Sequence, residues 1–388
     1  MRRATLVLTL VVAAAVGTVP RAGAFEATGN AVADGFLAVV QSGGYMDVAA
    51  TDVARQDGAT VLTGVSATSE DRAERLTIGT VEINGGVIDA DNRLIADRIA
   101  YGDVRITNRG GQEADSTATL ITVTNARLPL REGDGSWLAT VLGGFERVEV
   151  DGLVARPPVG GPVSVQHVEV ASAPADGGEV TSGRIALEGV EFDVAFLQGA
   201  ATQFLRDVGY ERMTIDALLD GRWDRAGGAA AIRDLTLSAD GLGAVTLEAT
   251  MDGVTAATIT ALSDGGGDVG RLLSLLQTVS VSALTVRYDD DGLAQRLIDR
   301  AAVQRGVDGQ EVIAGTVQAL RSALAVVGDP AFTEEVASAL SAFLADPGTL
   351  TLSAAPPSEV SVAQLFGGAV MQPRSLPALL NVTVTATP

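Results

Sequence analysis

Few residues of this chain are of the types that catalyse reactions. The 388-residue sequence has no cysteine and one histidine, His167, and all 27 of its basic residues are arginine. These absences exclude thiolate nucleophiles, cysteine metal sites, lysine Schiff bases and the P-loop lysine. Histidine clusters, the usual basis of zinc sites, are excluded as well. Carboxylates, hydroxyls and arginines are the groups left for chemistry.

The single histidine lies in an alternating segment, where it shares a face with Val165 and Glu169. No catalytic triad order and no metal partner accompany His167. We therefore expect a sheet-surface histidine without a catalytic role.

Two acidic segments have weak similarity to calcium loops. The run Asp289, Asp290, Asp291 lacks the alternating acids and the terminal glutamate of an EF-hand loop, so a helix cap is the better interpretation. The glycine-rich segment 263–268 has no nonapeptide repeat around it. We predict no metal site at either place.

Acidic pairs such as Glu334 and Glu335 could serve a glycosidase only if two carboxylates faced each other across a cleft. Nothing in the sequence indicates such a cleft, and the chain has only two tryptophans, Trp137 and Trp223. The sequence also has no nucleophile-elbow motif, and no dinucleotide-binding motif between a strand and a helix. We therefore predict no catalytic residue, no cofactor and no metal, and thus no enzyme; a carboxylate-based hydrolase is the third alternative.

The first 24 residues have the features of a secretory signal peptide. Arg2 and Arg3 precede an apolar run of 16 residues (4–19), and Ala22-Gly23-Ala24 is the small-x-small pattern of a cleavage site. The run is shorter than the roughly 20 residues of a membrane-spanning helix. We expect cleavage before Phe25, export to the periplasm or beyond, and no stable transmembrane segment in the mature protein.

The net charge limits the choice of partner. Cleavage removes three arginines and leaves 24 basic against 48 acidic residues, a net charge of −24 compared with −21 for the full chain. Such a charge opposes binding to nucleic acid or to a bare anionic membrane. A mean hydropathy of +0.28 nevertheless indicates a well-filled core. The absence of lysine and the many alanines suggest a GC-rich bacterial genome, which agrees with a periplasmic location.

Periodicity predicts a helix followed by many strands. Apolar positions at helical spacing predict a helix over 30–41, and alternation with a period of two predicts strands after it. A second amphipathic helix is expected over 196–208, with Phe196 and Phe204 on its buried face. The strands are expected over 60–66, 76–88, 94–106, 117–130, 148–155, 163–171, 183–194, 232–240 and 244–252.

Glycine recurs inside these strand patterns. Asn84-Gly85 and Asp151-Gly152 are good hairpin dipeptides, although a bulge that bends a continuous strand is the alternative. In the pair of strands around Gly241, we expect Leu237 and Val245 to be buried and Glu248 to face solvent. Four segments have the form "alternating triplet, glycine, alternating triplet": 81–88, 99–106, 148–154 and 185–192.

These glycine-punctuated strands, together with the segment 232–250, resemble the repeats of the AsmA and TamB proteins. The resemblance covers roughly residues 45–290. It implies an exported or membrane-anchored bacterial protein whose long curved sheet forms an apolar groove. This chain differs in having a cleavable signal and a helical C-terminal part, which argues against a role in bridging two membranes. The resemblance assigns no functional residue.

The last hundred residues are predicted to be mainly helical. Helices are expected there over 293–305, 310–327 and 330–345. Before this part, a short helix is expected over 272–279, followed by a strand that includes Leu284, Val286 and Tyr288. Asp290 or Asp291 is expected to cap the helix over 293–305. Short strands are expected over 350–352 and 380–385.

The expected fold is thus α+β and mostly antiparallel β, an elongated and strongly curved sheet with packed helices. The expected divisions are a signal peptide (1–24), a β-sheet body (25–290) and a mainly helical part that closes with a strand (291–388). The leading functional hypothesis is a non-enzymatic periplasmic protein that binds lipid or another apolar ligand in the trough of the sheet. The alternative is an envelope scaffold with a solid core, whose partner is another envelope protein.

Overall fold

The computed structural model describes residues 25–69, 73–108, 116–130, 144–157, 161–174, 180–225, 227–258 and 277–388. The expected signal peptide (1–24), the glycine-rich segment 263–268 and most of the expected helix over 272–279 lie outside these residues. The chain divides into two compact units. Unit 1 takes its described residues from Met1–Ser172, Ile185–Gln203 and Glu211–Met213, and unit 2 from Ala173–Arg184, Phe204–Tyr210 and Thr214–Pro388. Both sides of the expected division at residue 290 lie in unit 2.

Unit 1 is an antiparallel sheet with one helix. Strands β1 and β2 both pair with β3, after which β4, β6, β7, β8 and β9 follow in order, and β9 also pairs with β10. The short β5 pairs with β6. The elements are α2 (Ala31–Ser42), β1 (Tyr45–Ala49), β2 (Asp52–Gln56), β3 (Ala59–Ser69), β4 (Glu74–Asn84), β5 (Val87–Ile88), β6 (Arg93–Asn108), β7 (Ser116–Pro129), β8 (Arg147–Ala155), β9 (Val163–Pro174) and β10 (Val180–Asp193).

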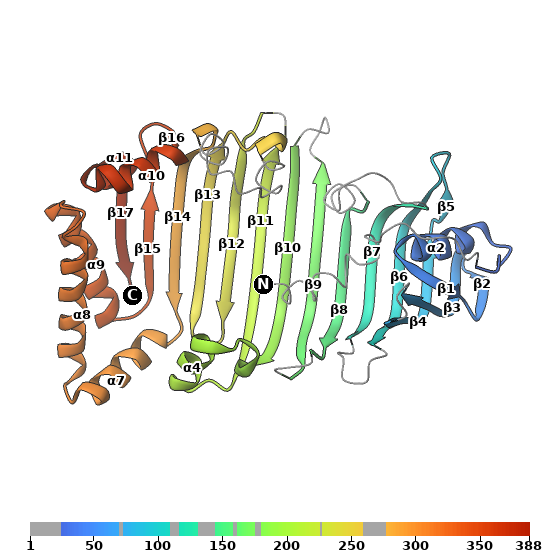
Figure 1. Cartoon of the computed structure of the whole chain (residues 1–388), viewed down its shortest axis with the longest axis horizontal. Helices are drawn as coiled ribbons and strands as arrows, with labels where there is room; N and C mark the ends of the chain where they lie inside the picture. Colours follow the sequence, from blue (N-terminus) through green and yellow to red (C-terminus); the bar gives the residue numbers. More distant parts are fainter. Residues whose placement is uncertain are drawn as a thin grey trace. The chain divides into compact units, whose positions relative to one another are not determined.

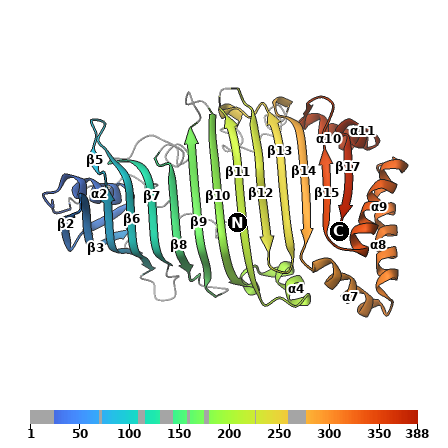
Figure 2. The same cartoon turned by 180° about the vertical axis from the view of Figure 1, so that it is seen from behind.

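The inner face of the unit 1 sheet is filled by side chains. Asn30 caps the start of helix α2, since its side chain accepts hydrogen bonds from the backbone amides of Val32 and Ala33. Figures 1 and 2 show strands β1 to β6 curving around this helix. Phe36 and Leu37 of α2 are fully buried in a core that continues along β3, β4 and β6 to β9. In its described part, this end of the predicted trough is therefore a solid core.

Neither expected hairpin dipeptide reverses the chain, so the hairpin interpretation was wrong and the alternative of a continuing strand holds. Asn84 pairs with Arg98, and β5 pairs with the same strand β6 beyond Gly85. Gly152 lies in the middle of β8, and the register with β9 is unchanged across it. Its φ is +62°, and a Cβ atom there would lie 2.5 Å from Thr119 Oγ1, so glycine allows this conformation without strain or a clash.

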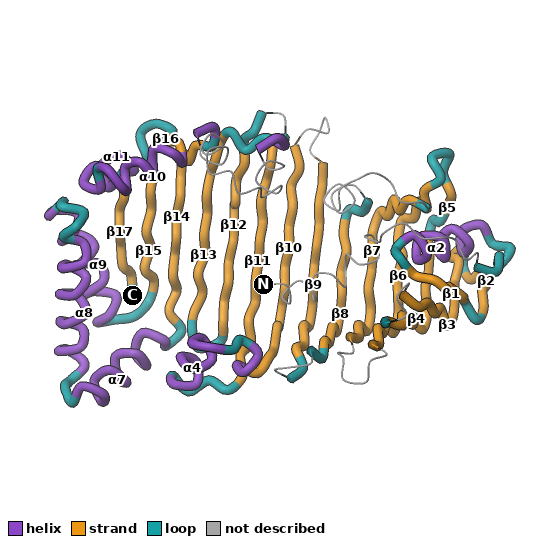
Figure 3. The backbone as a smooth tube through the Cα atoms, viewed as in Figure 1, coloured by secondary structure: helices purple, strands orange, loops and turns teal. Residues whose placement is uncertain are grey.

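Unit 2 is a second antiparallel ladder with helices at its C-terminal end. Strands β11, β12, β13, β14, β15 and β17 pair in that order, and β16 pairs with β14. Three consecutive helices, α7, α8 and α9, connect β14 to β15 (Figure 3). The elements are β11 (Arg212–Asp224), β12 (Ala230–Ala239), β13 (Gly243–Asp252), β14 (Ser280–Asp290), α7 (Leu293–Arg305), α8 (Gly309–Leu324), α9 (Pro330–Ala345), β15 (Thr349–Ala354), β16 (Val360–Ser361), α10 (Val362–Met371), η2 (Pro373–Ser375), α11 (Leu376–Leu380) and β17 (Val382–Thr387).

The segment 196–208, expected to form one helix, instead forms the end of a 3-10 turn and a shorter helix that buries a different face. Asp193 caps a short 3-10 turn, η1 (Val194–Phe196), and Gln198 has a φ of +57°. Helix α4 (Gly199–Asp207) therefore starts after this break, and its buried residue is Leu205. Phe204, which was expected on the buried face, is exposed.

The α+β fold dominated by antiparallel strands is confirmed, but the predicted burial of Leu237 and Val245 was wrong. Leu237 and Val245 do share one face, because they are directly opposite each other, yet both are exposed. Alternation identifies residues that lie on one face of a sheet. It does not show whether another layer covers that face.

We predict that Leu237→Asp changes the free energy of unfolding by less than about 1 kcal/mol, since the side chain is 54% exposed. The control is Val384→Asp in β17, which places a charge at a position that is 8% exposed and should cost several kcal/mol. Urea denaturation of the two variants measures both effects. Equal losses would mean that the Leu237 side chain is covered.

Candidate functional site

The sole histidine is paired on the sheet surface. His167 of β9 is directly opposite Asp151 of β8, and its Nδ1 lies 2.7 Å from Asp151 Oδ1. The hydrogen bond to Asp151 raises the pKa of the imidazole above its usual value. Both side chains are partly exposed, at 29% and 49%.

The His167–Asp151 pair predicts a pH-dependent stability. Because folding raises the histidine pKa, the pair stabilises the fold fully below the unfolded value of about 6.5 and loses this effect as pH rises through the folded pKa. The contribution should be at most about 1 kcal/mol, since the pair is partly exposed.

Melting curves of the wild type and His167→Ala at several pH values test this prediction. The wild type should be the more stable protein near pH 5.5, and the difference should shrink as the pH rises through the raised pKa of His167. A difference that grows toward alkaline pH would contradict it.

The three consecutive aspartates are all engaged in the structure. Asp289 accepts hydrogen bonds from Arg287 and Thr349, and Asp291 accepts one from the Gly241 amide. Asp290 accepts from the amides of Gly292 and Ala294 at the start of α7, although Gly292 occupies the cap position itself. Capping by the Asp290 side chain is thus observed. In the described part of the chain, no cluster of three or more acidic or histidine side chains has the geometry to hold a metal ion.

The acidic pair on α9 has two separate structural partners. Glu334 forms an ion pair with Arg321 of α8 at 2.7 Å, which lowers the pKa of the Glu334 carboxyl. Glu335 accepts a hydrogen bond of 3.0 Å from the amide of Val384 in β17. Among the described strands, β17 pairs with β15 alone, so its other side is an edge of the sheet. The hydrogen bond from the Val384 amide to Glu335 protects this edge.

Unit 2 contains a concave site, a pocket among its helices. It has a volume of about 350 Å³, which lies within the usual range for small-molecule sites. We call it the helical pocket. Its walls come from α7, α8, α9 and β14 and consist of Leu293, Ala294, Leu297, Ile298, Ala301, Arg305, Val312, Thr316, Phe343, Leu344 and Tyr288.

The position of α7 fixes one wall of the helical pocket. Arg296 stacks over the ring of Tyr210 at 5.0 Å and donates to its hydroxyl group. Arg300 forms an ion pair of 2.9 Å with Asp207. Ile298 of α7 also packs into a small core with α8 and α9. These contacts hold α7 in place while the apolar stripe beside them lines the helical pocket.

Tyr288 closes the helical pocket on the side of the sheet. Its ring contacts Phe343 of α9 in an edge-to-face arrangement, with 5.9 Å between the ring centroids. Its hydroxyl lies 2.6 Å from the carbonyl oxygen of Leu242 and 2.9 Å from Asp290 Oδ1. Burial, together with Asp290, raises the pKa of the Tyr288 hydroxyl above its usual range, so this wall stays uncharged.

An apolar sheet face adjoins the helical pocket at Tyr288. Directly opposite residues of neighbouring strands share one face, and the register places Val245 opposite Tyr288 and Leu237 opposite Val245. We define the apolar sheet face by two such rows: Leu219, Leu235, Leu247, Val286, Leu352 and Val384; and Ala217, Leu237, Val245, Tyr288, Leu350 and Ala386.

Four large side chains of the apolar sheet face are exposed: Leu235, Leu237, Val245 and Leu352. A contiguous exposed patch of this kind is uncommon on a protein surface that has no partner. It lies beside the helical pocket, and the two features together form the candidate functional site. The strand alternation identified residues of both rows, but nothing in the sequence pattern indicated a cavity among three helices.

One family model, described as "Uncharacterized protein", matches residues 236–387. The match begins in β12 and ends in β17, so it includes α7, α8 and α9 and much of the apolar sheet face. No curated protein matches the chain. Among the described residues, none of the helices has both the length and the hydropathy needed to cross a membrane.

Proposed function

We propose that this protein is an exported, non-enzymatic protein of the bacterial cell envelope that binds the acyl chain of a lipid in the helical pocket. The observation that carries the proposal is the pocket itself, about 350 Å³ in volume, with walls that are almost wholly apolar. Each methylene group transferred from water to such walls contributes about 0.8 kcal/mol. Burial of the chain therefore supplies affinity without a basic surface.

Several further observations support this assignment. The features of residues 1–24 favour export to the periplasm, and the resemblance of the strands to AsmA and TamB repeats favours an apolar ligand. The inner face of unit 1 is filled by α2, which favours unit 2 as the location of the ligand site. Phe36 and Leu37 occupy the volume that a ligand in unit 1 would need.

The test is the lipid content and the lipid affinity of the mature protein. Protein purified from the native host should release acyl lipid on organic extraction, detected by mass spectrometry. Titration with laurate, myristate and palmitate should show affinity that rises roughly tenfold for each two methylenes, in line with the transfer free energy. A lipid-free extract together with no binding of any of these acids would reject the proposal.

The second candidate function is an envelope scaffold. The exposed side chains of the apolar sheet face favour it, since they offer a surface to another protein. In that case, Leu237→Asp would abolish binding to the partner but leave the titration with fatty acids unchanged. Loss of fatty-acid binding in this variant would instead assign the sheet face to the lipid site.

A further inference from the structure

Arg305 is the one charged group among the described residues that line the helical pocket. It stands in the last turn of α7, whereas Leu293 and Tyr288 lie at the other end of the pocket wall. Arg305 follows Leu293 by 12 positions, which correspond to about 18 Å along the helix. The pocket wall thus has an apolar end next to the apolar sheet face and a cationic end.

The charge of Arg305 is not neutralised within the described part of the chain. Arg296 and Arg300 of the same helix bind Tyr210 and Asp207, but no ion pair or hydrogen bond of Arg305 is found there. Its Nη1 lies 4.0 Å from the point where a side chain at Gly315 would begin. The glycine therefore leaves space beside the guanidinium group.

We propose that Arg305 binds the carboxylate of a single-chain fatty acid whose tail points along α7 toward Tyr288. This inference rests on the proposed function and specifies its ligand class. A planar guanidinium matches a carboxylate with two parallel hydrogen bonds. The volume of about 350 Å³ suits one acyl chain better than two.

The charge near Arg305 favours a ligand with one negative charge. Asp308 and Glu311 follow Arg305 within six residues, and the protein as a whole carries a net charge of −21. A dianionic phosphate would meet stronger repulsion from these carboxylates than a monoanionic carboxylate. The alcohol of the same chain length, which has no charge, would lose the contact with Arg305.

The experiment compares laurate, dodecanol and dodecyl phosphate by displacement of a fluorescent fatty acid from the purified mature protein. Laurate should bind roughly fivefold more tightly than dodecanol at low salt, as expected for a partly exposed ion pair, and dodecyl phosphate should bind no more tightly than laurate. This preference should shrink at high salt. In Arg305→Gln, laurate and dodecanol should bind equally, and Arg305→Lys should restore part of the preference.

The control is Arg374→Gln, which makes the same change in charge at an exposed arginine outside the helical pocket. If Arg305 served only to stabilise the end of α7, Arg305→Gln would lower the melting temperature and leave the preference for laurate intact, which would overturn the inference. Equal binding of laurate and dodecanol by the wild type would also overturn it, while the proposed function would stand. Failure of all three ligands to bind would reject the proposed function as well.

Discussion

Replacing Phe36 with alanine is expected to lower the free energy of unfolding of unit 1 by about 3–5 kcal/mol. The side chain is 1% exposed, and its ring packs against that of Tyr101 with 5.8 Å between centroids. The substitution removes buried apolar surface and leaves a cavity between α2 and β6 that the surrounding strands can only partly close.

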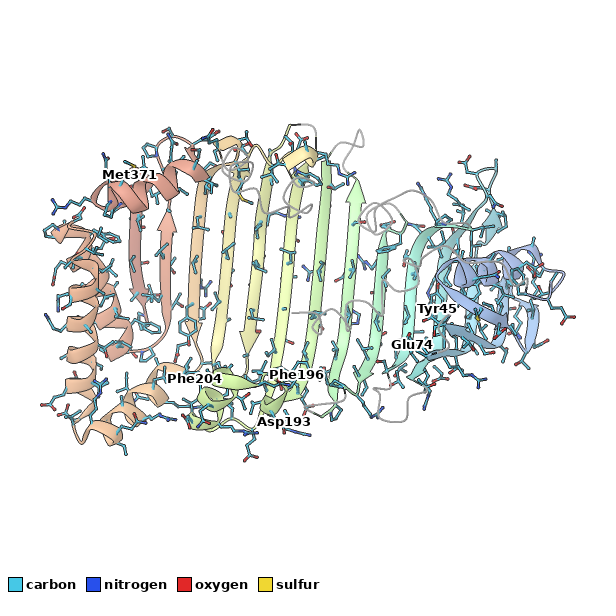
Figure 4. All side chains as sticks on the ribbon, viewed as in Figure 1. Tyr45, Glu74, Asp193, Phe196, Phe204 and Met371 are labelled. Carbon is cyan, nitrogen blue, oxygen red and sulfur yellow. The ribbon has the colours of Figure 1, made fainter. Side chains whose placement is uncertain are left out.

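Hydrogen exchange resolved by peptide is the appropriate measurement, because a chain with two compact units need not unfold in one step. Amides of α2 and β3 should exchange much faster in Phe36→Ala. The control is Phe204→Ala on α4, since this phenylalanine is 45% exposed and lies at one end of the unit 2 strands (Figure 4). A similar cost for both substitutions would mean that α2 is only loosely packed on the unit 1 sheet.

The sequence predicts best those helices and strands whose apolar residues recur at a regular spacing and whose ends are marked by a capping residue, a glycine or a proline. Helix α9 runs from Pro330 to Ala345 as expected, because Asp329 caps its start and a proline follows at the first position. Strand β11 was not predicted, since the consecutive apolar residues Ala217, Leu218 and Leu219 break the alternation that marks a half-buried strand.

The site could not be predicted from the sequence, because it depends on how distant segments pack. The stripe on α7 is visible as a periodic pattern, but a stripe of this kind normally belongs to a filled core. Only the placement of Phe343 and Tyr288, 50 and 5 positions from Leu293 along the chain, shows that this stripe lines a cavity. In the same way, Leu237 was assigned to the core because alternation contains no information about what lies above the sheet.

Filling the helical pocket with Ala301→Phe is expected to weaken fatty-acid binding at least roughly thirtyfold, the equivalent of two to three buried methylenes. Ala301 lies near the middle of the α7 stripe that lines the pocket and packs beside the small helical core. A phenyl ring at this position would occupy the volume that the acyl chain needs, while α7 remains tied to α4 through Arg300 and Asp207. Titration with palmitate measures the loss.

The matched control is Val303→Phe on the same helix, at a position that is 84% exposed and outside the pocket. It adds the same ring to α7 and should leave palmitate binding unchanged. A melting temperature for each variant shows whether the fold has survived, because overpacking can itself cost about 1–3 kcal/mol. If Ala301→Phe folds normally and still binds palmitate like the wild type, the acyl chain does not enter the helical pocket. The apolar sheet face would then be the remaining candidate, and Leu237→Asp would be the variant that removes binding.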